Sequence, residues 1–319
     1  MIGPGTYPEE GGKVKGAEED MMRMHFLKTM WSDIIILQGE KEAALIDTGM
    51  ADQFPMLQAY LDELGIRDIS FILLTHFHRD HYGSIPALLD RYRVGCVYLK
   101  EYSGLDRTTA WGSPADDAYR TAEENTFRAI WKQTQEKSRA IPCETLQEID
   151  FEGHKMQLFS VSNSMRTIYE DAAYPETFHQ YAFSENQNSL AALLRINGAK
   201  IFFGGDLHDI PSTHPLADRV NYQIAREIGE EIDLYKAPHH GTRGTALPET
   251  MQIYRPRNVV ITNGLKYLPP DSEIFQSLRA ARPDAKIYLT ENQHVIFSVD
   301  ADGTVRLEYG PEPYDLSMG

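Results

Sequence analysis

Short runs of β-branched and aromatic residues alternate with amphipathic stretches along most of the chain. Such short runs are typical of buried strands, whereas apolar residues three or four positions apart predict a helix. The runs predict strands at Asp33–Gln38, Ala43–Asp47, Phe71–Thr75, Cys96–Leu99, Ser189–Ile196, Lys200–Gly204, Asp233–Ala237, Asn258–Thr262, Lys286–Thr290 and Val295–Val299. The helical spacing predicts helices over Gln53–Leu64, Ser84–Arg91, Pro114–Arg139, Pro215–Glu230 and Asp271–Ala281, the second with Ser84 as its N-cap. Because both halves repeat the order strands, helix, strands, we expect an α/β sandwich of two mixed sheets flanked by helices.

The same pattern divides the chain into one main domain and two short ends. Residues 1–20 hold five glycines and five carboxylates, which predicts a flexible segment. The domain is expected over residues 21–310, with a tail of residues 311–319. Residues 101–181 are too long for an ordinary connection and carry one strong helix, so we interpret them as an insertion.

Composition limits the classes of partner and compartment. The chain has 319 residues and a formal net charge of −16, which argues against a nucleic-acid partner because a phosphate backbone would be repelled. Its only cysteines are Cys96 and Cys143, too few for a disulfide framework, so a reducing, cytoplasmic location is the default expectation. No apolar run approaches the length of a membrane span. A secreted protein whose leader had been removed would show the same pattern.

The most informative segment follows the predicted strand that ends at Thr75. It delivers His76, His78, Asp80 and His81 into the loop before the next helix, where α/β sheets place chemistry. His76 and His78 are two positions apart in an extended chain, so both project to one side and can bind one ion. Asp80 and His81 lie past the bend and can bind a second. Imidazole and carboxylate ligands suit zinc first, then manganese or iron.

This His-x-His-x-Asp-His loop resembles that of the metallo-β-lactamase-fold hydrolases, and the likeness extends over about residues 21–300. The resemblance implies an αββα sandwich with two Zn²⁺ per chain. It implies that Asp47, at the end of an early strand, braces the metal loop from behind. Asp206 after Gly204-Gly205 would bridge the two metals, and one of His239 and His240 would complete the second site.

Further motifs resemble one branch of that family. Asn188-Ser189-Leu190 before Asp206, the run Lys236 to Thr242, and the segment 263–269 are similar to the soluble domain of DNA-internalisation competence proteins and to phosphorylcholine esterases. The chain departs from the better-known lactamases and glyoxalases at the third histidine of the first metal site. It has Glu185, Asn186, Gln187 and Asn188 there, and the nearest upstream histidine is His179. Either one of these side chains ligates weakly, or the first metal keeps an open position.

The expected site therefore has three kinds of residue. The expected metal ligands are His76, His78, Asp80, His81, Asp206 and His239 or His240. Asp80, His239 and His240 are also the expected catalytic residues, because the non-ligating member of the pair would contact developing negative charge or donate a proton. Second-shell or substrate-binding roles are expected for Asp47, Glu185, Asn186, Asn188, His208, Lys236, Thr242 and Tyr267.

Four functions are compatible with such a site. The first is hydrolysis of a small phosphodiester or phosphorylcholine ester by a metal-activated water. The second is hydrolysis of a lactone, thioester or β-lactam. A DNA nuclease and a non-hydrolytic iron protein rank lower. Aromatic residues of the insertion, Trp111, Tyr119, Trp131, Tyr169, Tyr174 and Tyr181, would form either a cage for choline or packing for the helix. The insertion is also a candidate contact for a homodimer.

Overall fold

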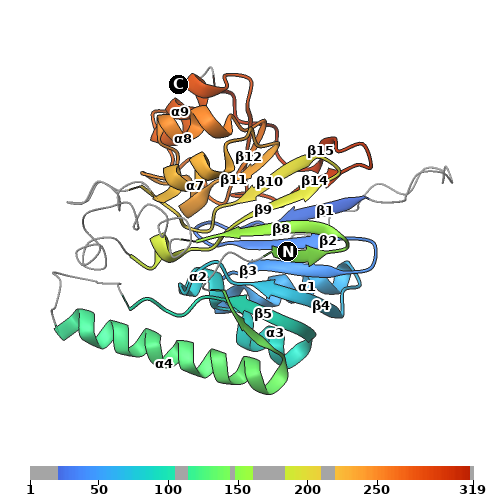
Figure 1. Cartoon of the computed structure of the whole chain (residues 1–319), viewed down its shortest axis with the longest axis vertical. Coiled ribbons are helices and arrows are strands. Elements are labelled where there is room, and N and C mark those ends of the chain that lie inside the picture. The colour runs from blue at the N-terminus through green and yellow to red at the C-terminus, as the bar shows by residue number, and fades with distance from the viewer. Residues whose placement is uncertain (1–20, 105–113, 144–147, 161–183, 210–219, 317–319) are drawn as a thin grey trace, which may run out of the picture.

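Two β-sheets pack face to face, with helices on both outer sides (Figure 1). The computed structural model describes residues 21–104, 114–143, 148–160, 184–209 and 220–316. The first sheet has the order β15-β14-β1-β2-β3-β4-β5-β6 and the second has the order β13-β12-β11-β10-β9-β8-β7.

Each sheet contains an antiparallel part and a parallel part. The strands of the first sheet are β1 (Met22–Phe26), β2 (Ile34–Gln38), β3 (Ala43–Thr48), β4 (Asp68–Leu73), β5 (Arg93–Leu99), β6 (Ala140–Pro142), β14 (Val295–Val299) and β15 (Val305–Tyr309). Those of the second are β7 (Glu148–Phe151), β8 (His154–Phe159), β9 (Ala191–Ile196), β10 (Ala199–Phe203), β11 (Leu234–Lys236), β12 (Asn258–Ile261) and β13 (Lys286–Leu289). Strands β3 to β6 run parallel, as do β10 to β13, and the other pairings are antiparallel. The predicted α/β class with two mixed sheets is thus confirmed.

Helices cover both outer faces because successive strand residues point to opposite sides. The helices on the first sheet are α1 (Phe54–Glu63), α2 (Arg79–Tyr82), α3 (Ile85–Arg91) and α4 (Pro114–Lys137), and those on the second are α7 (Val220–Ile228), α8 (Pro248–Tyr254) and α9 (Glu273–Ala281). In β10, Ile201 and Phe203 lie in the core between the sheets, whereas Phe202 faces the core under α7, α8 and α9. In the described part of the chain no helix is long and apolar enough to cross a membrane.

All ten predicted strands are present, with ends that differ by at most three residues, and each predicted helix has a counterpart. Strands β1, β6, β7, β8 and β15 and helices α2 and α8 are additional. Ser84 is the N-cap residue of α3 as predicted, but its hydroxyl donates to the carbonyl of Met50 and makes no capping hydrogen bond to the helix.

The range 101–181 is not one continuous insertion in the described residues. Helix α4 does lie outside the sheets, but β6 extends the first sheet beside β5, and β7 and β8 form an edge of the second. In β7 and β8 polar or charged residues alternate with apolar ones, because each strand buries one side only. Neither strand therefore forms a continuous apolar run in the sequence. These strands therefore belong to the sandwich itself.

The ends of several strands meet at one edge of the sandwich. The amide of Leu190, before β9, donates to the carbonyl of Thr75, after β4, at 2.7 Å. The amide of His239, after β11, donates to the carbonyl of Gly205, after β10, at 3.0 Å. These backbone bonds bring the loops that carry the predicted site residues together.

Candidate metal centre

The loop after β4 is anchored by the apolar residue between its first two histidines. Phe77 is buried and stacks on Tyr82 of α2, with ring centroids 4.1 Å apart. It also meets Phe127 of α4 edge-on at 5.1 Å. With Phe77 turned into the core, its neighbours His76 and His78 point the other way, towards the second sheet.

Six of the predicted residues come together in two clusters that share one carboxylate. The three-residue group is His76, His78 and Asp206, and the four-residue group is Asp80, His81, Asp206 and His240. In each group the candidate ligand atoms lie within 4.8 Å of one another. Asp206 Oδ2 is 3.7 Å from His76 Nε2, and Asp206 Oδ1 is 3.3 Å from His81 Nε2. Asp206 Oδ2 also lies 3.8 Å from His240 Nε2, so the Asp206 carboxylate is shared by both groups.

Two buried atoms in these groups point to a cation. His81 Nε2 and Asp206 Oδ1 are buried and have no hydrogen-bond partner among the described residues. Because an unpaired buried polar atom costs free energy, both atoms fit a site that a metal ion completes. The donor set of imidazoles and carboxylates also matches zinc, manganese or iron.

Charge in the four-residue group is shared between carboxylates and imidazoles. Burial lowers the pKa of His240, but the carboxylates of Asp206 and Asp33 outweigh burial and raise this pKa to about 9. Burial also lowers the pKa of His81, yet Asp206 and Asp47 raise it well above its ordinary value. Metal binding at this group would therefore displace protons from imidazoles.

Asp47 holds His81 from behind. Its carboxylate accepts hydrogen bonds from the amide and hydroxyl of Thr75, at 2.8 and 2.7 Å, and contacts His81 Nδ1 at 2.7 Å. When Nδ1 of His81 donates to a carboxylate, Nε2 is directed towards Asp80 and Asp206. The left-handed backbone of Asp47, with φ +56°, is a costly conformation of the kind found at functional sites.

The adjacent histidines after β11 occupy different environments. Both residues have left-handed backbone, with φ +44° at His239 and +53° at His240, which turns their side chains apart. His240 is buried, and its Nε2 lies 3.3 Å from Asp80 Oδ2. The side chain of His239 is 27% exposed. Its Nε2 lies 3.9 Å from Asp206 Oδ2 and 3.2 Å from the side-chain nitrogen Nδ2 of Asn186. Thr242 contacts His239 Nδ1 at 2.9 Å and so orients the ring.

Asp33 was not predicted as a site residue. It precedes β2, is buried, and forms an ion pair with Lys236 at the end of β11. The same carboxylate accepts a hydrogen bond from Thr262 at 2.7 Å and lies 3.3 Å from His240 Nδ1. Lys236 is therefore paired with a buried carboxylate. The sequence signal that could have identified Asp33 as a site residue is its position as a charged residue directly before the apolar run of β2.

Glu185, in the segment that stands in place of the third histidine, does not belong to the three-residue group. Glu185 accepts hydrogen bonds from the amides of Phe77 and Ser103, both at 2.8 Å, and so ties the metal loop down. Asn188 donates to the carbonyl of Glu101 at 3.2 Å. His179 lies outside the described residues.

Two further predicted residues border the groups. His208 is buried with its ring 5.1 Å from that of His239, and burial lowers its pKa to about 4. Tyr267 is 43% exposed and meets Trp31 edge-on at 5.3 Å, and Trp31 in turn lies 5.9 Å from the His240 ring. Trp31 was also missed by the sequence analysis.

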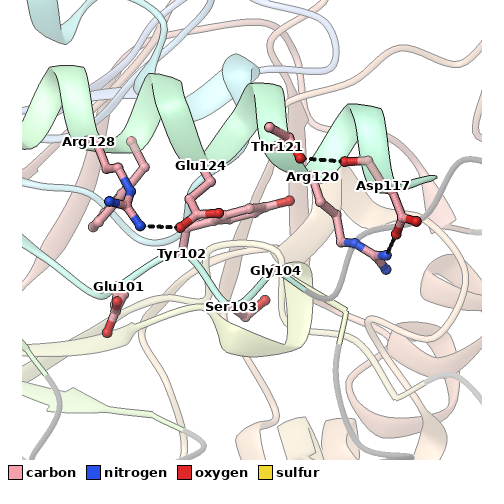
Figure 2. Close-up of a pocket in the computed structure, with 10 residues that line it drawn as sticks. Glu101, Tyr102, Ser103, Gly104, Asp117, Arg120, Thr121, Glu124 and Arg128 are labelled. Carbon is pink, nitrogen blue, oxygen red and sulfur yellow. Dashed lines mark hydrogen bonds and ion pairs between the residues drawn. The ribbon is translucent and has the colours of Figure 1, made fainter. Parts of the chain in front are cut away.

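A cavity of about 730 Å³ lies between α4 and the loop that follows β5 (Figure 2). Tyr102, Ser103 and Gly104 form its floor, and α4 contributes ion pairs between Arg120 and Asp117 and between Arg128 and Glu124. No residue of the two metal groups lines this cavity. Of the predicted aromatic cage, Trp131 packs against the core beside Phe127, and Trp111, Tyr169, Tyr174 and Tyr181 lie outside the described residues.

Comparisons with known proteins agree with this geometry. Residues 32–158 match the family model of the metallo-beta-lactamase superfamily. The metallo-beta-lactamase fold-containing protein ST1585 of Sulfurisphaera tokodaii is 26% identical over 133 residues, which are 39% of this chain and 46% of that protein. The match thus spans less than half of the length of that relative.

Two solved structures align with most of this chain at low sequence identity. The metallo-beta-lactamase fold protein YhfI from Bacillus subtilis has a TM-score of 0.50 at 12% identity and covers 88% of this chain and 100% of that one. A diphosphatase from the PhnP family has a TM-score of 0.47 at 13% identity and covers 88% and 99%.

Proposed function

We propose that this chain, whose family-model match and fold support a metallo-hydrolase of the metallo-beta-lactamase superfamily, hydrolyses small phosphodiesters, with phosphorylcholine esters among them. The observation that carries the proposal is the pair of ligand groups that share Asp206. Two zinc ions held by these groups would supply Lewis acidity and lower the pKa of a water molecule towards neutrality.

The chain's own residues would then position the substrate. His240 lies inside the four-residue group, so we assign it as the ligand of the pair. His239 remains outside both groups, with Nε2 directed towards Asp206 and partly exposed to solvent. We assign His239 to contact a phosphoryl oxygen or to protonate the leaving oxygen at Nε2.

Two features favour a phosphodiester over a lactone, thioester or β-lactam. Among the described residues the three-residue group contains two histidines, and Glu185 is bonded to backbone amides. On this basis we assign an open position for a substrate oxygen to that group. The motifs around Asn188 and Lys236 also resemble a branch of the family that cleaves phosphoesters. The net charge of −16 favours a small substrate over a nucleic acid.

The test is a substrate panel on zinc-reconstituted protein. Bis(p-nitrophenyl) phosphate and p-nitrophenyl phosphorylcholine should be cleaved, and γ-lactones, thioesters and nitrocefin should be poor substrates. Cleavage of the carboxylic compounds with no activity on the phosphodiesters would contradict the proposal and assign the same site to carboxylic ester or amide chemistry.

A further inference from the structure

We infer that the two ligand groups bind metal with unequal affinity, and that Asp33 makes the four-residue group the tighter one. This inference rests on the proposed function, because it requires that both groups hold metal. It goes beyond that function by ordering the two sites and by giving Asp33 a role as a positioning residue.

The numbers and charges of the donors already differ between the groups. Among the described residues, the four-residue group offers two carboxylates and two imidazoles, whereas the three-residue group offers two imidazoles and the shared carboxylate of Asp206. More protein ligands and more negative charge favour a divalent cation at the four-residue group. The charge of Asp80 is thus one source of the difference.

The contacts behind the imidazoles increase this difference. In the four-residue group, His81 Nδ1 lies 2.7 Å from Asp47, and His240 Nδ1 lies 3.3 Å from Asp33. A carboxylate behind a ligating imidazole fixes the ring and makes its other nitrogen a stronger donor. In the three-residue group, His76 Nδ1 has the hydroxyl of Thr75 at 3.1 Å, just as His240 Nδ1 has that of Thr262 at 2.9 Å. The direct contact with the Asp33 carboxylate is therefore what distinguishes His240.

Asp33 is placed to hold the four-residue group together. Its amide donates to the carbonyl of Asp80 at 3.3 Å, and its side chain contacts both His240 and Thr262. Lys236 lies in the second sheet, is 1% exposed and forms an ion pair with the carboxylate of Asp33. The ammonium group offsets the charge of Asp33, so this carboxylate remains buried beside Asp47, Asp80 and Asp206.

The experiment titrates the metal-free protein with Zn²⁺ in competition with a chromophoric chelator. The wild type should bind two equivalents whose dissociation constants differ by about tenfold or more. His76→Ala should keep the tight equivalent and His240→Ala should lose it, which assigns the order. Asp33→Asn should weaken the tight equivalent by about 10- to 100-fold and leave the second nearly unchanged.

A second variant separates metal binding from folding. Asp33→Asn alone leaves Lys236 buried without its carboxylate and is expected to lower the melting temperature of the metal-free protein. Asp33→Asn/Lys236→Met removes both charges at similar volume and should restore much of that stability, yet still bind the tight equivalent weakly. Asp233→Asn, at the opposite end of β11 from Lys236, is the matched control and should leave both affinities unchanged.

The outcomes that overturn the inference differ from those that overturn the proposed function. Equal affinities in the wild type, or wild-type zinc affinity in the double variant, would show that Asp33 has no role in ordering the sites. Failure of the wild type to bind any zinc would instead remove the basis of the proposed function. The d–d absorption of the protein loaded with one equivalent of Co²⁺ gives an independent readout, because it should change in Asp33→Asn and not in Asp233→Asn.

Discussion

His239 and His240 are neighbours in sequence, but the left-handed backbone at both positions places their side chains in different environments. His240 is buried among Asp33, Asp80 and Thr262, whereas His239 lies at the solvent side beside Asn186. The two substitutions to alanine should therefore have different consequences.

His239→Ala should keep both zinc equivalents and lower kcat by about 10²- to 10⁴-fold, because a positioned proton donor or phosphoryl contact is lost. His240→Ala should lose zinc from the four-residue group. Metal content and kcat measured on the same preparations check both statements. Loss of zinc in His239→Ala with retention in His240→Ala would reverse the assignment.

Outside the site, His25 should make the metal-free protein sensitive to acid. Its ring contacts Tyr60 and Gln38 while 2% exposed, and burial lowers its pKa to about 4. Between about pH 6.5 and 4 the unfolded chain binds this proton and the native protein does not, so stability falls as the pH falls through that window. The loss is of order 3 kcal/mol.

Chemical unfolding of His25→Gln in chelator, between pH 7 and 4, should show a flatter pH profile than that of the wild type. His154→Gln, a partly exposed histidine of β8, serves as the control. Identical profiles for the wild type and His25→Gln would contradict this role.

At the scale of elements, the turn after β10 sets the position of Asp206. Gly205 has φ +53°, and an added Cβ would lie 2.8 Å from the Cβ of Thr75, next to His76. A side chain here would therefore strain the backbone and also push the β10 turn away from the metal loop.

Gly205→Ala should lower the free energy of unfolding by about 2–4 kcal/mol and reduce zinc occupancy. Gly65→Ala is a matched control, because Gly65 has φ +71° but nothing within 4 Å of an added Cβ. It should cost only about 1 kcal/mol of backbone strain and leave zinc unchanged. Equal effects of both variants in chemical unfolding would show that the contact with Thr75 is unimportant.

The elements also show what the sequence could and could not reveal. Strands buried on both faces, such as β3 and β4, read as apolar runs and were predicted, together with the loop of His76 to His81. Strands with one exposed face, such as β7 and β8, were missed because their alternating polar and charged residues do not form such runs. Asp33 was missed because its partners Lys236, His240 and Thr262 come from distant segments that only the folded sheets bring together.

At the scale of the whole molecule, some of the carboxylates that make up the net charge of −16 are buried in the sandwich. Asp33, Asp47, Asp80 and Asp206 lie close together at one edge, where Lys236 and the imidazoles of His81 and His240 offset part of their charge. A divalent cation that binds the native state would take the place of the imidazole protons and stabilise the fold.

Zinc should therefore raise the melting temperature relative to protein in chelator. At a free concentration 100 times the dissociation constant, one site contributes about 2.7 kcal/mol to the free energy of unfolding. Differential scanning calorimetry over a zinc series checks this, with Mg²⁺ as the control cation, because magnesium prefers oxygen ligands. A melting temperature independent of zinc would contradict the linkage.

The shared carboxylate of Asp206 gives the most direct test of the metallo-hydrolase assignment. Metal content by mass spectrometry, after zinc reconstitution and removal of excess ions, should reach two equivalents in the wild type. In Asp206→Ala, which removes the carboxylate common to both groups, it should fall to one or fewer. No zinc in the reconstituted wild type, or the same content in Asp206→Ala, would contradict the account.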